Sequence, residues 1–172
     1  MSVVLAQISA DGQTYDVRRA ERVDVPAIVD LIAADQIGAA RDGGADLEPY
    51  ERAFAAIDGD PAQLLVVVTE PAGGAVVATL QLTVIPGLAR RGSLRGQIEA
   101  VRVRADLRGR GLGQALLSWA IDEARRRGCT LIQLTSDKRR EDAIRFYGRL
   151  GFTASHEGLK LRVDRADRPP TG

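Results

Sequence analysis

Apolar residues recur along this chain with two different periods, one typical of strands and one typical of helices. The run Leu64–Thr69 is apolar almost throughout, as expected of a strand buried on both faces. Between Leu112 and Trp119, apolar residues recur three and four positions apart, which is the pattern of one helix face packed on a core. By the same criteria we expect strands at 14–19, 64–69, 75–85, 97–103 and 129–135, and a pair of strands within 152–163. We expect helices after Asp24 and at 47–57, 112–127 and 141–150.

The order of these elements predicts the fold class and the domain. Strands that alternate with helices indicate an α/β protein whose mixed sheet is covered on both faces. The helix at 112–127 supplies the crossover that parallel strands at 97–103 and 129–135 require. Within the first of these strands, alternation places Gln97, Glu99, Val101 and Val103 on one face. We expect one domain at 14–163, a mobile lead-in at 1–13, a glycine-rich loop at 38–45 and a disordered tail at 164–172.

Composition narrows the classes of function. The 172 residues carry a net charge of +1 at pH 7, so a general nucleic-acid partner is not indicated. No apolar run approaches the ~20 residues that span a membrane, and the N-terminus has no signal-peptide pattern. With one cysteine and one histidine, neither an internal disulfide nor a structural zinc site is expected. We therefore predict a cytoplasmic protein without a metal ion or a membrane partner.

The most informative stretch is a basic, glycine-rich loop between a predicted strand and a predicted helix. It reads Arg108-Gly109-Arg110-Gly111-Leu112-Gly113. Glycines allow tight turns and let a ligand approach the main chain closely. The first amides of the following helix lack internal partners and carry partial positive charge. The loop is therefore suited to a phosphate or pyrophosphate, and Arg104, Arg108 and Arg110 add positive charge.

Two common phosphate-binding motifs do not fit this loop. The dinucleotide fingerprint G-x-G-x-x-G fails because its third glycine would fall on Gln114 or Leu116. A P-loop fails because neither lysine of the chain follows a glycine. The remaining pattern, Arg-x-x-Gly-x-Gly after a valine-rich strand, resembles the acyl-CoA loop of the GNAT family of N-acetyltransferases. The distal segment Ala143–Phe152 also resembles that family, and the resemblance extends over about residues 16–163.

The resemblance implies a fold, a cosubstrate and a set of contacts. The family fold is a mixed, mostly antiparallel, twisted sheet of six to seven strands, with about four flanking helices and one parallel pair of strands that splay apart. The cosubstrate would be acetyl-CoA, with its pyrophosphate on the amides of residues 108–113. The pantetheine arm would lie between the splayed strands and pair with the main chain of Val101 and Val103, much as an added strand would.

Two residues are candidates for catalytic roles. Tyr147 matches the tyrosine of the family's Phe-Tyr-x-x-x-Gly-Phe segment, which implies an acid that protonates the departing thiolate; the alternative is a core aromatic residue. Glu99 is the candidate base, directly or through a water, because a carboxylate in a mostly apolar strand is costly unless it is used or paired. The alternative for Glu99 is a salt bridge to an arginine. The family commonly has Asn, in contact with the cosubstrate, where this chain has Arg140. Here Arg139 or Arg140 would instead meet a phosphate of the cosubstrate.

These features predict an acetyl-CoA-dependent N-acetyltransferase whose acceptor is a small primary amine. The domain is small and has no long acidic run to hold a basic tail, and a predicted loop carries Arg90, Arg91 and Arg95. Arginines suit an acceptor that also bears a carboxylate or phosphate, whereas the acidic residues within 42–48 favour a cationic acceptor such as a polyamine. The alternative function is a catalytically silent acyl-CoA sensor or interaction domain of the same fold. A homodimer is compatible with either function.

Overall fold

The computed structural model describes residues 3–34, 46–71, 74–161 and 163. They belong to two units, Met1–Leu134 and Thr135–Gly172, and each unit has its own secondary structure. The loop expected at 38–45 and the tail expected at 164–172 lie outside the described residues.

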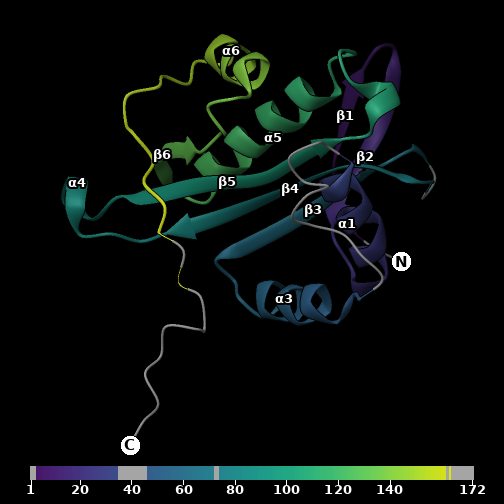
Figure 1. Cartoon of the computed structure of the whole chain (residues 1–172), viewed down its shortest axis with the longest axis horizontal. Helices are drawn as coiled ribbons and strands as arrows, with labels where there is room; N and C mark the ends of the chain where they lie inside the picture. The colour runs from purple at the N-terminus through teal and green to yellow at the C-terminus, as the bar shows by residue number, and fades with distance from the viewer. Residues whose placement is uncertain (1–2, 35–45, 72–73, 162, 164–172) are drawn as a thin grey trace, which may run out of the picture. The chain divides into compact units, whose positions relative to one another are not determined.

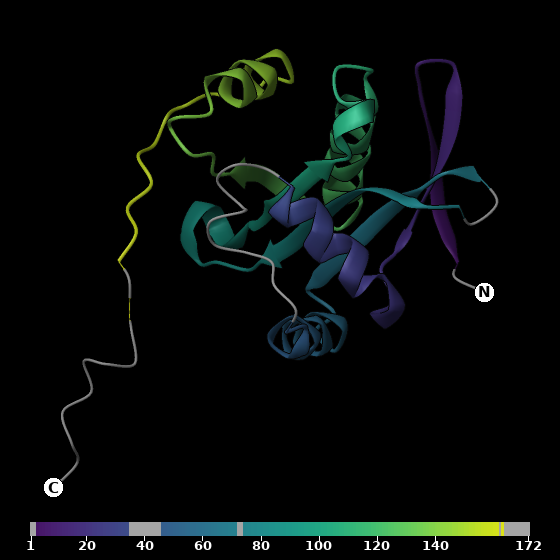
Figure 2. The same cartoon turned by 45° about the vertical axis from the view of Figure 1, so that its right-hand side comes forward.

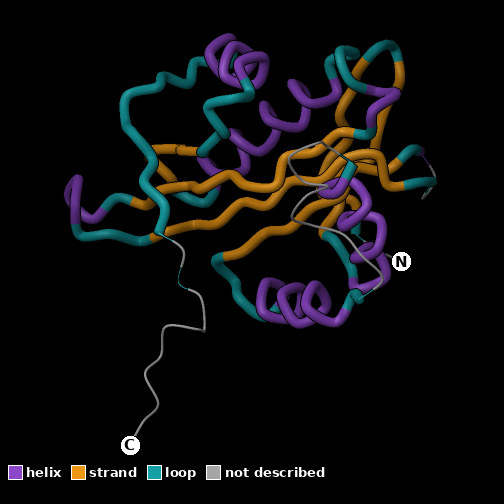
Figure 3. The backbone as a smooth tube through the Cα atoms, viewed as in Figure 1, coloured by secondary structure: helices purple, strands orange, loops and turns teal. Residues whose placement is uncertain are grey.

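The first unit is built on one six-stranded sheet (Figure 1, Figure 3). The strands lie in the sheet in the order of the chain: β1 Val4–Ala10, β2 Gln13–Arg19, β3 Gln63–Thr69, β4 Val76–Ile85, β5 Leu94–Val103 and β6 Cys129–Leu134. Among these strands, neighbours are antiparallel except for β5 and β6, which run parallel. The predicted mixed, mostly antiparallel sheet is confirmed, and its parallel pair is the predicted one.

Helices cover both faces of this sheet. The first unit has α1 Val25–Ala33, α3 Glu48–Asp58, the short α4 Ala89–Gly92 and α5 Leu112–Arg126, with 3-10 turns η1 Arg22–Asp24 and η3 Ala105–Leu107. Helices α1 and α3 lie on one side of the sheet and α5 on the other (Figure 1, Figure 2). The second unit contains α6 Glu141–Arg149. The α/β class is confirmed.

Each face of the sheet has its own set of buried side chains. On the α5 face, Leu64, Leu82 and Ile98 are register partners across β3, β4 and β5, and each is at most 2% exposed. On the opposite face, Leu65 and Val67 belong to a cluster with residues of α1 and α3. Burying a large aliphatic side chain contributes roughly 1.5–3 kcal/mol, so these two layers hold the helices on the sheet.

Strands β5 and β6 pair over only part of β5. The parallel register extends from Leu94 to Ile98, and β5 then continues without β6 beside it. One residue later, β5 contains a bulge: Glu99 faces Gln81, but the next paired residue of β5 is Arg102, which faces Thr79. Two residues of β5 therefore oppose one residue of β4, as in a β-bulge.

The bulge corrects the predicted alternation of β5. Ala100 has φ = 52°, a left-handed conformation that is uncommon for a residue with a side chain. Beyond it the pleat is out of phase, so Val101 does not share a face with Glu99 as a simple period of two predicts. Alanine carries no turn signal, and the bulge could not be read from residue types.

Two other expectations are also corrected. Most of the lead-in expected over residues 1–13 is a strand, β1. Only Ile8 and Ala10 of β1 are buried, so the sequence lacks the apolar pattern that would have predicted this strand. The strand pair expected within 152–163 has no counterpart among the described residues of that stretch. There, Leu159 and Leu161 are 94% and 88% exposed, and alternation alone does not stabilise a strand without neighbours.

A buried ion pair joins β2 to the start of α1. Asp24 is 5% exposed and receives two hydrogen bonds from the Arg18 guanidinium, at 2.6 and 2.8 Å. The backbone N–H of Glu21 also donates to Asp24, at 2.8 Å. Burial opposes ionisation of Asp24, but these hydrogen bonds and the charge of Arg18 outweigh it, so the pKa of Asp24 lies below its ordinary value.

We expect Asp24→Asn to reduce the free energy of unfolding at neutral pH by about 3 kcal/mol, because it leaves the half-buried Arg18 without its counter-charge. A carboxylate with a depressed pKa stabilises the fold above its unfolded-state pKa of 3.8. That contribution is lost as the pH falls through the folded-state value, so the gap between wild type and variant should close below pH 3.8.

Chemical denaturation measured between pH 7 and pH 3 checks this expectation. The matched control is Asp58→Asn, because Asp58 pairs with Arg19 at 3.7 Å on the surface and should contribute less than about 1 kcal/mol. Equal losses for the two variants at pH 7 would contradict a special role for the Asp24 pair.

Candidate active site

The glycine-rich loop leads from η3 into the first turn of α5. Gly109 and Gly111 have φ of 74° and 86°, and Gly111 is the N-cap residue of α5. A Cβ atom built on either glycine would meet no atom of the described residues within 4 Å. The main chain therefore borders open space at a helix N-terminus, where N–H groups lack intrahelical partners. This geometry fits the anion site predicted from the sequence.

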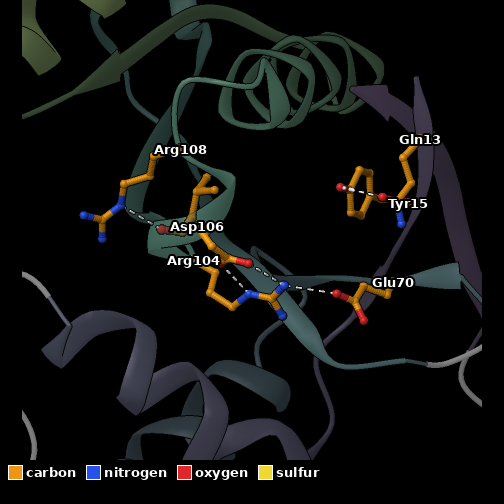
Figure 4. A network of polar contacts seen from close by, with 7 residues as sticks. Gln13, Tyr15, Glu70, Arg104, Asp106 and Arg108 are labelled. Atoms are coloured by element: carbon orange, nitrogen blue, oxygen red, sulfur yellow. Dashed lines mark hydrogen bonds and ion pairs between the residues drawn. The ribbon is translucent and has the colours of Figure 1, made fainter. Parts of the chain in front are cut away.

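Arg104 stabilises the turn that precedes this loop (Figure 4). Its guanidinium contacts Glu70 at 3.1 Å and Asp106 at 2.7 Å. The hydrogen bond to Arg104 also lowers the pKa of Asp106. Arg104 is one of the residues expected to add positive charge to the anion site, but two carboxylates compensate its charge, and the residue instead joins the end of β3 to η3.

Arg108 and Arg110 differ from Arg104 in their contacts. Arg108 donates from Nε to the main-chain oxygen of Val103 at 3.0 Å (Figure 4). Arg110 lies 3.6 Å from Asp11, and both side chains are more than half exposed. Such an exposed pair is weak, so the charge of Arg110 stays available to an anion at the loop.

β6 ends at Leu134, opposite Ile98, so within the first unit no strand pairs with the outer main-chain edge of the second half of β5. The oxygen of Val101 accepts a hydrogen bond from Arg102 Nη1 at 2.8 Å, and the oxygen of Val103 accepts one from Arg108. Since a carbonyl oxygen has two lone pairs, both can accept a further donor. Val101 and Val103 are the residues predicted to pair with an extended ligand.

Glu99 lies immediately before the bulge and is exposed. Among the described residues no arginine lies within ion-pair distance of its carboxylate, so the salt-bridge alternative finds no partner there. A carboxylate at the point where β5 leaves β6 is placed to meet a group bound along the free edge.

The second unit holds the other predicted site residues. Tyr147 is half-buried on α6, with its ring 5.4 Å from that of Phe146 and 6.0 Å from that of Phe152. Arg140 is the N-cap residue of α6 and lines a hollow of about 420 Å³ at the start of that helix. Tyr147 and Arg140 belong to the second unit, whereas the loop and β5 belong to the first. The roles of Tyr147 and Arg140 therefore stay predictions based on the sequence motif.

Cys129 does not have the surroundings of a nucleophile. It is 7% exposed, and burial raises the pKa of its thiol, although the charge of Arg127 partly opposes the shift. A reactive cysteine needs the thiolate, so this residue is a packing residue. Within the described ranges no cluster of three or more His, Cys, Asp or Glu could hold a metal ion. No helix among those residues is long and apolar enough to cross a membrane.

The fold and the loop define an acetyltransferase class, and comparison of the sequence with family models agrees. The model of the acetyltransferase (GNAT) family matches residues 27–152. The chain therefore belongs to this family, and the resemblance noted in the sequence is confirmed.

Individual relatives cover the chain to different extents. An aminoalkylphosphonate N-acetyltransferase of Salmonella typhimurium is 43% identical over 61 residues, which are 36% of this chain and 40% of that protein. An uncharacterized N-acetyltransferase of Methanocaldococcus jannaschii is 43% identical over 56 residues, or 33% of this chain and 25% of that protein. The matched stretch thus spans less than half the length of these curated relatives.

Solved structures match nearly the whole chain. The crystal structure of a protein named as a transcriptional regulator from Bacillus halodurans has a TM-score of 0.81 and 43% identity, and the match covers 87% of this chain and 99% of that one. Glucosamine-6-phosphate N-acetyltransferase from Arabidopsis thaliana has a TM-score of 0.71 at 20% identity, over 88% of this chain and 100% of that one. The second likeness concerns the fold alone.

Proposed function

We propose that the protein is an acetyl-CoA-dependent N-acetyltransferase that acts on a primary amine of a small molecule. The observation that carries the proposal is the open space in front of Gly109 and Gly111, which lies at the N-terminus of α5 and follows a strand with a free edge. Membership of the family supports acetyl transfer, and this geometry supports the way in which the chain would hold acetyl-CoA.

Residues 108–113 would bind the pyrophosphate through main-chain amides, with Gly109 and Gly111 allowing the close approach. The free edge of β5 would bind the pantetheine arm at Val101 and Val103, by strand-like main-chain hydrogen bonds. Arg108 now donates to the oxygen of Val103. Its guanidinium is therefore close enough to the loop to meet a phosphate as well.

Direct transfer requires a neutral amine, a polarised carbonyl and a proton for the leaving thiolate. Glu99 would take a proton from the attacking amine, directly or through a water, and Tyr147 would give a proton to the thiolate. A bulge leaves one residue outside the ladder, so a main-chain N–H next to Glu99 would be available to the carbonyl oxygen. Arg140 would contact a phosphate of the cosubstrate in place of the family's usual asparagine.

The acceptor class is supported by one relative. The Salmonella relative is named for aminoalkylphosphonates, which are small primary amines. We place the reaction in the cytoplasm, where a free thiol such as that of Cys129 stays reduced. The competing function is an acyl-CoA sensor without turnover, and the name of the Bacillus relative, a transcriptional regulator, is what favours it.

Gly111→Ala should weaken acetyl-CoA binding by at least about tenfold, because its methyl group would fill the space that the pyrophosphate needs. The control is Gly128→Ala, because Gly128 has a similar φ of 84° and a Cβ there would make only an ordinary contact at 3.5 Å. It therefore reproduces the backbone strain at the other end of α5. Calorimetric titration of both folded variants with acetyl-CoA measures the difference, and equal affinities would exclude this placement of the pyrophosphate.

Tyr147→Phe should lower kcat by ~10²–10⁴-fold and leave acetyl-CoA affinity intact, if proton donation to the thiolate limits the rate. Tyr15→Phe serves as control, because the Tyr15 hydroxyl donates a hydrogen bond to Gln13 within β2 (Figure 4). CoA release in single-turnover experiments is the measurement. If the Tyr147 variant turns over like wild type, Tyr147 has only a packing role. If the wild-type protein binds acetyl-CoA but releases no CoA with any amine, the sensor function is favoured.

Glu99→Gln should lower the rate by ~10²–10⁴-fold, and the loss should be largest at low pH, where the acceptor amine is hardest to deprotonate. Rates of CoA release are compared over pH 6–9 with a panel of amino acids, polyamines, aminoglycosides and aminoalkylphosphonates. A variant profile parallel to that of wild type would remove Glu99 from the role of base. Turnover of lysine peptides alone would exclude a small-molecule acceptor.

A further inference from the structure

A small cavity lies in the first unit at the connection between β4 and β5. Its volume is about 50 Å³, above the ~10–15 Å³ that a cavity needs to hold one water molecule, so it has room for a small polar group. Arg90, Ser93 and Arg95 line it together with the apolar side chains of Ile85 and Leu131. The sequence pointed to three arginines in this region, and the structure separates Arg90 and Arg95, which line the cavity, from Arg91, which does not.

Strand register connects this cavity to Glu99. Arg95 lies between Ile85 of β4 and Leu131 of β6, so these residues form one row across the sheet. Alternate residues of a strand share a face, and Arg95 therefore projects from the same face as Glu99. The opposite face of β5 packs on α5, because a Cβ on Gly96 would lie 3.4 Å from that of Ala124.

A polar row crosses the sheet between Arg95 and Glu99. Its members are the half-buried register partners Gln63, Thr83, Gln97 and Gln133. Thr83 donates to the side-chain oxygen of Gln63 at 2.7 Å, and Gln133 donates to that of Gln97 at 2.6 Å. Amides are costly to bury without hydrogen-bond partners, so this stretch is suited to a polar ligand and not to a packed helix.

The two cavity arginines are not neutralised by the described part of the chain. No described carboxylate lies within ion-pair distance of Arg90 or Arg95, whereas Arg104 has two such partners. Arg90 and Arg91 both have left-handed φ, 53° and 59°, so the backbone beside the cavity is strained, as is common at ligand sites. The cavity thus combines two uncompensated guanidinium groups, a hydroxyl and a recess.

We propose that Arg90 and Arg95 bind the anionic end of the acceptor while Glu99 meets its amine. The acceptor would then be a short primary amine that carries a phosphonate, phosphate or carboxylate. This inference rests on the proposed function and adds a binding site for the anionic end of the acceptor. Arg95 and Glu99 lie four residues apart on the strand, so their Cα atoms are about 13 Å apart. The long side chain of Arg95 can shorten the gap between the two charged groups, and with a charge-assisted contact of about 2.8 Å at each end the remaining span suits a short aminoalkyl chain.

Steady-state kinetics with a pair of acceptors test the proposal. The probes are 2-aminoethylphosphonate and propylamine, and the readout is the ratio of their kcat/KM values. Arg95→Gln should lower this ratio by roughly 10- to 100-fold, the effect of losing a hydrogen-bonded charge pair. Arg91→Gln removes the same charge from the same connection but not from the cavity, and it should leave the ratio unchanged. An unchanged ratio in Arg95→Gln, or an equal change in both variants, would overturn the proposal.

Binding of 2-aminoethylphosphonate, measured by calorimetry without turnover, separates this inference from the proposed function. If wild type acetylates no amine but binds the probe, and Arg95→Gln weakens that binding at least tenfold, the anion site stands and the proposed function fails. If wild type acetylates propylamine but does not bind or acetylate 2-aminoethylphosphonate, the proposed function stands and the anion site is overturned.

Discussion

The end of the pairing between β5 and β6 is the constraint on which the rest of the site depends. The two strands pair from Leu94 to Ile98, where β6 ends, and β5 continues through its bulge. A free sheet edge is normally a liability, because its main-chain groups recruit other strands. Here arginine side chains of the same chain hold the oxygens of Val101 and Val103, which leaves an edge that is solvated and still able to accept an extended ligand.

The second requirement is a fixed conformation of the turn and loop that lead into α5. Arg104 joins the end of β3 to η3 through Glu70 and Asp106, and all three side chains are at least one-third exposed. Pairs of this kind contribute little to stability, so their effect is geometric. They hold the turn before the loop, and the two left-handed glycines then place the first amides of α5 next to open space. The anion site thus depends on surface ion pairs more than on the core.

Elements with strong periodicity could be predicted from the sequence. The apolar run of β3 and the stripe of α5 gave bounds within a few residues, because the buried faces of both are filled by aliphatic side chains. The loop was predictable because its glycines are required by backbone conformation. The strand β1 was not, since only two of its residues are buried. The cavity at Arg95 was also out of reach, because it depends on the register of three strands, and register is a property of pairing and not of one segment.

The bulge at Ala100 resolves a conflict between the strict alternation of β5 and the charge of Arg102. This conflict can be recognised in the sequence only once the structure is known. With a strict period of two, Arg102 would share a face with Ile98, which is 1% exposed against α5, and would bring a charge into that core. The extra residue shifts the phase, so that Arg102 faces Thr79 as Glu99 faces Gln81, and Arg102 lies on the same face as Glu99, away from α5. A left-handed alanine costs about 1–2 kcal/mol, less than a buried unpaired guanidinium. The same distortion that keeps the core apolar therefore also sets the free edge and the carboxylate of Glu99 beside each other.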